Sequence, residues 1–294
     1  MKPYLALFVG VLAVSFAAVF IRLAEAPPLA IAAYRMAIAA ALLLPFTSLK
    51  TVRSLAQLSR RDLLLVVLSG MFLALHFWLW ITSLSYTSIA SSVVLVTAHP
   101  VFVVIVSYFL WGERLSKAVF GGIGIAFMGV VLINYSGLIL DSQALLGNLL
   151  ALAAGLVMGA YLITGRQLRA RIDFVSYLTA IYAVAAIALL IAVAISGTSL
   201  FGYSTETYTM LVLLALVPQL IGHSSLNLAV RLIPVTLVSV AILGEPVGAT
   251  ILGALIIGEA PTVNELFGGV LILGGIYVVI RKSFRRDSAG KKLT

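Results

Sequence analysis

Residues 98–113 read AHPVFVVIVSYFLWGE, and residues 244–259 read GEPVGATILGALIIGE. In both stretches an ionisable residue and a proline open an apolar run, and Gly-Glu closes it. The openings, His99-Pro100 and Glu245-Pro246, lie 146 positions apart, and the closing pairs keep the same spacing. A pattern that recurs at a fixed offset predicts that the chain contains two copies of one structural unit.

The composition is that of a membrane protein. Of 294 residues, 62% are hydrophobic and 10% are charged, which leaves too few polar side chains to cover a water-facing surface. Cysteine is absent, so disulfides, thiolate metal sites and cysteine nucleophiles are excluded. The formal charge of +9 does not predict nucleic acid as a partner, because the basic residues lie in short loops between apolar segments.

About 20 apolar residues are needed to span a bilayer, and ten such segments can be delimited. We predict spans at 4–22, 28–47, 63–84, 88–111, 117–135, 145–165, 174–196, 208–230, 235–257 and 264–281. The connections are short apart from 48–62 and 197–207, so no soluble domain is inserted.

The basic residues predict the orientation of these spans. In a ten-span arrangement, all 19 Lys and Arg residues except Arg22 and Arg35 fall on the side that holds both termini. Cytoplasmic loops carry such an excess. We therefore expect a multi-pass protein of the cell inner membrane with both termini in the cytoplasm and a basic tail, 284–294, on the cytoplasmic leaflet.

The offsets divide the spans into two sets of five. Gly121-Gly122 and Gly268-Gly269 repeat at an offset of 147, close to that of the first two motifs. Because five is odd, the second copy enters the membrane upside down, as in many secondary transporters. We predict an all-α membrane protein whose ten transmembrane helices form two inverted five-helix repeats, 1–140 and 141–283, around a central cavity.

Two longer stretches, 90–114 and 238–259, together with Ile21-Arg22-Leu23 and Tyr34-Arg35-Met36, resemble the drug/metabolite transporter superfamily in its ten-helix EamA-type branch. The resemblance covers essentially the whole chain. It implies helices around a central cavity, with the fifth and tenth spans peripheral, and export of a small organic metabolite such as an amino acid or a drug.

Four ionisable residues lie near the middle of predicted spans: His76, His99, His223 and Glu245. Such residues are costly in the bilayer and usually face a cavity or a partner, so we expect their side chains to converge. Helical spacing places Trp80 one turn after His76, and Gln219 and Asn227 one turn either side of His223.

Arg35 lies about two turns inside the second predicted span. Its guanidinium is suited to grip a substrate carboxylate. The alternative is that the side chain snorkels to the membrane interface.

Glu245 is the leading candidate for proton exchange. An isolated carboxylate in hydrocarbon is unfavourable, so this carboxyl stays protonated unless a cation or a protonated histidine pairs with it. Pro246 removes a backbone N–H and frees the Ile242 carbonyl, and interrupted helices often line transporter sites. The alternative is a structural role, with Glu245 hydrogen-bonded to a histidine and locking the two halves together.

These features predict a secondary transporter that binds a small-molecule substrate and exports it by alternating access, with proton antiport as the drive and uniport as an alternative. No phosphate-binding loop is present, and no cofactor is expected. Three histidines and a glutamate are potential metal ligands, but the sequence lacks a His-rich loop or clustered carboxylates, so no metal is expected.

Two rival functions are a passive channel and an intramembrane enzyme. The enzyme would need a nucleophile and base or a His-Glu-x-x-His motif, and neither is found. Glycines of the fifth and tenth spans favour close helix packing and leave the chain as a monomer or a homodimer. They are Gly121, Gly122, Gly124, Gly129, Gly268, Gly269, Gly274 and Gly275.

Overall fold

The regular structure of the chain is helical wherever it is described. The structure, a computed structural model, describes residues 2–47, 58–111, 116–140, 142–169, 172, 174–232 and 241–290. Its helices are α1 (Lys2–Ser15), α2 (Ala17–Leu23), α3 (Pro28–Leu43), η1 (Leu44–Phe46), α5 (Arg60–Ser83), α6 (Ile89–Val96), α7 (His99–Trp111), α8 (Lys117–Leu140), α9 (Ser142–Arg169), α10 (Phe174–Ser196), α11 (Thr205–Leu214), η2 (Ala215–His223), α12 (Ser224–Leu232), α14 (Gly244–Leu252), η3 (Gly253–Ile257) and α15 (Val263–Gly290).

Several of these helices are long and apolar enough to cross a bilayer. Within the described residues six meet that condition, at Tyr4–Leu23, Pro28–Phe46, Arg60–Ser83, Ser142–Gly165, Val175–Ser196 and Thr205–Leu226. Four shorter apolar helices cover Ile89–Val103, Lys117–Ile133, Gly244–Ile257 and Val263–Val279. The prediction of an all-helical membrane protein is confirmed, whereas ten crossings in two inverted repeats stay a prediction.

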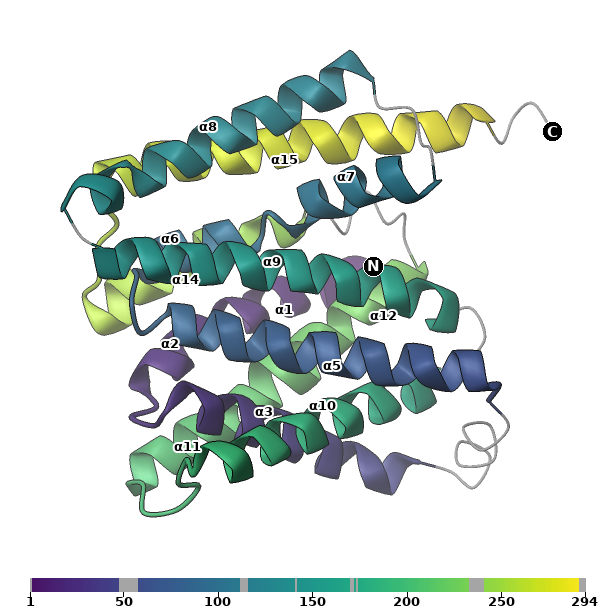
Figure 1. The fold of residues 1–294 in the computed structure, drawn as a ribbon, viewed down its shortest axis with the longest axis vertical. Coiled ribbons are helices and arrows are strands. Elements are labelled where there is room, and N and C mark those ends of the chain that lie inside the picture. Colours follow the sequence, from purple (N-terminus) through teal and green to yellow (C-terminus); the bar gives the residue numbers. More distant parts are fainter. Residues whose placement is uncertain are drawn as a thin grey trace.

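The helices run back and forth between two ends of one bundle (Figure 1). The link that joins α2 to α3, the first turn of α9 and the link that joins η3 to α15 lie together on the left of that view. We call this the Arg22 end, because Arg22, Thr87 and Glu259 lie there. The opposite side, toward which the last turns of α15 extend, is the tail end.

The packing partners of the helices are related between the two predicted halves. Helix α1 packs against η2, α12 and α14, and α9 packs against α5, α6 and α7. Helix α3 packs against α10, and α8 packs against α15. In the predicted repeat, α1 corresponds to α9, and the helices that α1 contacts correspond to those that α9 contacts. The contacts are therefore the same when the two predicted halves are exchanged.

Helices α8 and α15 form a pair at the edge of the bundle (Figure 1), and glycines allow their close approach. A Cβ at Gly122 would lie 2.9 Å from the Gly275 carbonyl oxygen, and one at Gly129 would lie 2.5 Å from that of Gly268. The other predicted packing glycines differ. A Cβ at Gly121, Gly124 or Gly274 would have nothing within 4 Å, and one at Gly269 would face only the Val94 side chain.

Four of the predicted spans are interrupted rather than continuous, the first of them by a turn at Phe16 between α1 and α2. Helix α6 ends at Val96 and α7 begins at His99, because Pro100 lacks the N–H that would continue the ladder to the Val96 carbonyl. Around Pro218 the chain widens into the π-helical segment η2, a feature that is frequent at functional sites. Helix α14 begins at Gly244, after a turn at Leu243.

Other boundaries differ from the prediction. Helix α15 begins at Val263 and continues to Gly290, so it extends beyond the predicted end of the tenth span at 281 and into the predicted tail. Residues 235–240, the first part of the predicted ninth span, lie outside the described residues.

Candidate functional site

Most of the predicted polar residues lie around one cavity inside the bundle, on the continuous helices α3 and α5 and on the interrupted spans that contain α7, η2 and α14. The cavity has a volume of about 50 Å³. Its lining includes six of the eight predicted residues: Arg35, His76, Trp80, His99, His223 and Glu245. Both predicted halves contribute, since the last two residues belong to η2 and α14. In the structure these six residues lie close together around the cavity, as expected. Their role in binding stays a prediction.

Arg35 lies deep in the bundle rather than at its surface. Its side chain is 1% exposed, so the snorkelling alternative is wrong for this structure. The guanidinium carbon lies 4.0 Å from the ring centroid of Phe77 and 5.8 Å from that of Trp80, distances at which a cation is attracted to an aromatic face. Arg35 Nε donates a hydrogen bond of 2.8 Å to Gln219 Oε1.

Two N–H groups in the cavity wall have no acceptor among the described residues. They are Arg35 Nη1 and Trp80 Nε1, and both nitrogens are buried. Buried polar groups in proteins are nearly always hydrogen-bonded, because an unmade bond costs free energy. Because both residues line the cavity, these two donors are the groups most ready to bind a ligand oxygen there.

The three histidines line the cavity from three segments. His76 Nδ1 lies 3.0 Å from the Ala154 carbonyl oxygen, so this nitrogen carries a proton and leaves Nε2 as an acceptor in the neutral ring. The ring stacks on Trp80 at a centroid distance of 6.3 Å. His99 is the first residue of α7, and His223 packs edge-on against Phe77.

Glu245 lies in the first turn of α14, where the helix dipole favours negative charge. Within the described residues the only ion pair joins Arg22 to Glu259, so no Arg35 nitrogen lies within 4.0 Å of a Glu245 carboxyl oxygen. No hydrogen bond between Glu245 and a histidine is present in that part of the chain. The cavity thus holds a guanidinium and a carboxyl group that do not pair with each other.

The remaining two predicted residues lie elsewhere. Gln219 is 1% exposed. It accepts the hydrogen bond from Arg35 Nε and does not line the cavity. Asn227 lies on α12, but its side chain is outside the described residues.

Sequence reasoning missed Phe77, which both Arg35 and His223 contact. Helical spacing would have found it, because Phe77 precedes Trp80 by three residues on the same helix. It also missed Thr97 and Met158, which line the cavity. Thr97 lies in the break between α6 and α7, where helical periodicity gives no guidance.

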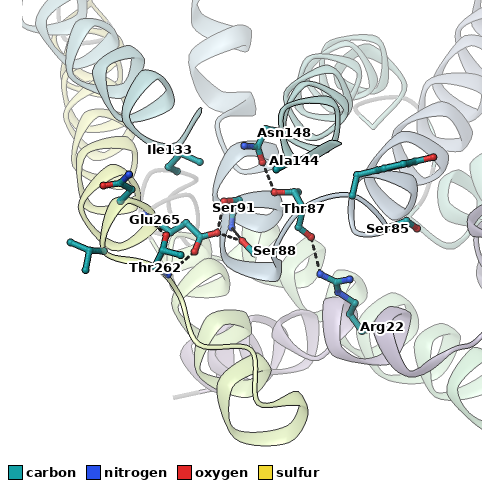
Figure 2. A pocket seen from close by; sticks show the side chains of 13 residues that line it. Arg22, Ser85, Thr87, Ser88, Ser91, Ile133, Ala144, Asn148, Thr262 and Glu265 are labelled. Atoms are coloured by element: carbon teal, nitrogen blue, oxygen red, sulfur yellow. Dashed lines mark hydrogen bonds between the residues drawn. The ribbon is translucent and has the colours of Figure 1, made fainter. Parts of the chain in front are cut away.

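A second, larger cavity of about 640 Å³ lies at the Arg22 end. Figure 2 shows the polar network on its wall. Glu265 accepts hydrogen bonds from the Ser88 and Ser91 hydroxyls, and Thr87 Oγ1 donates to Asn148 Oδ1 at 2.7 Å. The network joins the start of α6 to α9 and α15, so it ties the two predicted halves together at this end.

In the described part of the chain no group of three His, Asp or Glu side chains is placed to hold one ion. The residues that line the central cavity supply a guanidinium, an indole N–H, three imidazole rings and a carboxyl group.

Residues 1–135 and 145–281 of the chain match the EamA-like transporter family. The chain belongs to this family. The two matched segments lie on either side of the link between α8 and α9. Membership in a family of membrane transporters accounts for the apolar helices and for polar residues gathered inside the bundle.

Curated relatives carry the same general description. A protein of Archaeoglobus fulgidus named an uncharacterized transporter is 26% identical over 287 residues, which cover 95% of this chain and 96% of that protein. The uncharacterized transporter YdfC of Bacillus subtilis is 25% identical over 272 residues, covering 92% and 87% of the two chains. These names indicate a transporter rather than an enzyme.

A solved structure supports the arrangement of the helices. A crystal structure superimposes on this chain with a TM-score of 0.66 at 21% identity, covering 94% of this chain and 96% of the other. At this identity the similarity concerns the fold alone.

Proposed function

We propose that the protein is a secondary active transporter that exports a small organic metabolite by alternating access, with proton antiport as the driving reaction. One observation carries the proposal: ionisable residues from both predicted halves line a single cavity buried between interrupted helices. Substrate sites of secondary transporters lie at such places, near the middle of the bilayer and between repeats. Glu245 is the proposed proton-exchanging group, because it lines the cavity without an ion-pair partner among the described residues.

Alternating access requires two bodies that move against each other around the site. The inverted repeats 1–140 and 141–283 are the proposed bodies. The exchange relation between the packing partners of α1 and α9 supports this assignment, as do the two segments that match the family. The glycine contacts between α8 and α15 hold the peripheral pair together.

The proposed orientation places both termini in the cytoplasm and the Arg22 end outside the cell inner membrane. The distribution of Lys and Arg supports it, since all but two lie in the predicted cytoplasmic segments. Export then proceeds from the tail end toward the Arg22 end.

A passive facilitator is the second candidate, because a polar cavity between inverted repeats also suits a channel. Counterflow in reconstituted vesicles separates the two. A ligand is first identified by thermal-shift screening of amino acids, nucleosides and cationic drugs. Vesicles loaded with that unlabelled ligand should then accumulate the labelled ligand transiently above the external concentration. Equilibration without an overshoot would mean a channel, and no flux of any binding ligand would contradict transport.

A further inference from the structure

We propose that Arg35 and Trp80 form a subsite for a carboxylate group of the transported substrate. The inference rests on the proposed function, since it names the chemical group that the central cavity binds. It starts from two buried N–H donors that lack an acceptor among the described residues, Arg35 Nη1 and Trp80 Nε1.

The charge of Arg35 is not compensated by the groups in contact with it. Its hydrogen-bond partner is the neutral amide of Gln219, and its aromatic neighbours are Phe77 and Trp80. A guanidinium that is 1% exposed is expensive to bury unless an anion pairs with it. The described residues supply no such anion within 4.0 Å, so a ligand anion is the group that the environment lacks.

The surroundings of Arg35 fix its direction before a ligand arrives. The bond to Gln219 holds Nε on one side, and the Phe77 ring lies 4.0 Å from the guanidinium carbon. This leaves Nη1 without a partner on the remaining edge. A donor held in place in this way loses little conformational freedom when it binds.

The second donor favours a carboxylate over a single-oxygen ligand. Trp80 is 4% exposed, lines the same cavity as Arg35, and its indole N–H can only donate. A carboxylate has two oxygens that accept hydrogen bonds in one plane. The number of unpaired donors equals the number of carboxylate oxygens, and the cavity of about 50 Å³ has room for a small planar group rather than a bulky one.

Glu245 does not occupy this subsite. No oxygen of its carboxyl lies within 4.0 Å of an Arg35 nitrogen, although both residues line the cavity. Glu245 is therefore left for a hydrogen-bond donor of the substrate or for the exchanged proton. The break before His99 adds the N-terminus of α7 to the same cavity, and helix N-termini favour negative charge.

The test compares carboxylates with their amides, which lack the carboxylate charge, on the purified full-length protein in detergent. The probes are benzoate, L-leucine and L-phenylalanine, each beside its amide. We expect at least one carboxylate to raise the melting temperature and to bind in calorimetric titration, with its amide at least about tenfold weaker, as for loss of one charge-assisted hydrogen bond. Equal binding of acid and amide in all three pairs, or no binding by any of the acids, would overturn the proposal.

Variants assign the effect to the two donors. Trp80→Phe removes the N–H and keeps an aromatic ring, so it should weaken carboxylate binding about tenfold or more and leave amide binding unchanged. Trp78→Phe is the matched control, because Trp78 is on the same helix but 41% exposed. It should bind like the parent.

Two further variants act on the charge and keep the proposal testable if one fails to fold. Gln219→Glu keeps an acceptor for Arg35 Nε and adds a negative charge that competes with the ligand. It should therefore weaken binding of the acid and leave binding of the amide unchanged. Arg35→Lys keeps the charge but loses the planar fork, and it should bind the acid less tightly than the parent. Parent-like acid binding in both folded variants would contradict the subsite.

The outcomes separate this inference from the proposed function. If vesicles transport an uncharged ligand with counterflow while no acid is preferred, transport stands and the carboxylate subsite fails. If acids bind as expected but no ligand shows flux, the subsite stands and the transport proposal fails.

Discussion

Arg22 and Glu259 pair across the Arg22 end of the bundle, with Nη2 of the arginine 3.0 Å from Oε2 of the glutamate. The two residues come from α2 and from the segment after η3, which belong to different predicted halves. Arg22 also donates to the Thr87 carbonyl oxygen at 2.8 Å, and Glu259 accepts from the Ile89 backbone N–H. The pair therefore joins the halves at the same point where α6 begins.

The first prediction is that this pair keeps the Arg22 end closed above the central cavity. Glu259→Gln keeps an acceptor for Ile89 but removes the charge that attracts Arg22. A partly exposed pair, with side chains 29% and 25% exposed, contributes up to about 1 kcal/mol, so the open population should rise by up to about fivefold. The absence of cysteine allows a single reporter, Thr97→Cys, which lines the cavity.

A membrane-impermeant maleimide added from the Arg22 side should label that reporter faster in the Glu259→Gln background. Glu206→Gln is the matched control, because Glu206 is an exposed residue in the first turn of α11. It should leave the labelling rate unchanged. Equal rates in the parent and in Glu259→Gln would mean that the pair is not a closing contact.

The Arg22–Glu259 pair illustrates what the sequence could and could not predict. The repeat of Gly-Glu placed Glu259 at the end of a predicted span, and charge counting placed Arg22 at the opposite side from the termini. Neither pattern predicts that the two side chains meet, because their 237-residue separation is closed only by the packing of α14 and η3 against α2. Glu113, its counterpart in the first predicted repeat, lies outside the described residues.

The second prediction concerns the glycine contact between α8 and α15. Gly129→Ala would place a methyl 2.5 Å from the Gly268 carbonyl oxygen and 2.8 Å from Ile272 Cγ1. Because backbone must move to admit it, we expect a loss of about 1–3 kcal/mol in unfolding free energy. Gly124→Ala is the control on the same helix, since nothing lies within 4 Å of its Cβ position.

Thermal melting in detergent should show a lower melting temperature for Gly129→Ala and an unchanged or higher one for Gly124→Ala. The control can rise because alanine is favoured over glycine inside a helix by about 0.5–1 kcal/mol. Parallel losses in both variants would mean that the two glycines serve helix geometry rather than a close interface.

The third prediction concerns orientation. Ser199 is exposed in the link between α10 and α11, and Arg60 is exposed at the start of α5, toward the other end. In intact cells an impermeant maleimide should label Ser199→Cys but not Arg60→Cys, and permeabilisation should expose both. A reporter fused after Thr294 should be active only in the cytoplasm. Labelling of Arg60→Cys from outside would reverse the proposed topology.

The central cavity was predicted with more success than its chemistry. Ionisable residues near the middle of a span usually face a cavity or a partner, which sufficed to select His76 and Glu245, and helical spacing from His76 selected Trp80. The bond between Arg35 and Gln219 was not predicted, since it joins α3 to η2 across 184 positions of sequence. The π-helical widening around Pro218 also shifts the faces that a regular helix would give Gln219 and His223.

The fourth prediction concerns Glu245 and the proposed proton antiport. Glu245→Gln keeps the shape and hydrogen-bonding capacity of the side chain but cannot gain or lose a proton. A buried carboxyl is costly to ionise without a partner, so its protonation should depend on whether the cavity is open to water. We expect the variant to fold and to bind substrate, because the amide resembles the protonated acid, while transport driven by a pH gradient is lost.

Reconstituted vesicles decide this with two measurements on the same preparation. An imposed pH gradient should drive uptake of the substrate by the parent but not by Glu245→Gln. Counterflow without a gradient should persist in the variant, because exchange of substrate for substrate needs no net proton movement. Glu206→Gln, at an exposed site, should behave like the parent in both. If Glu245→Gln responds to the gradient with the rate and pH dependence of the parent, Glu245 is a structural residue and antiport through it is wrong. Loss of both activities in a folded variant would instead assign the carboxyl to a step that exchange and driven transport share, either substrate binding or the conformational change, and calorimetric titration of the ligand would distinguish the two.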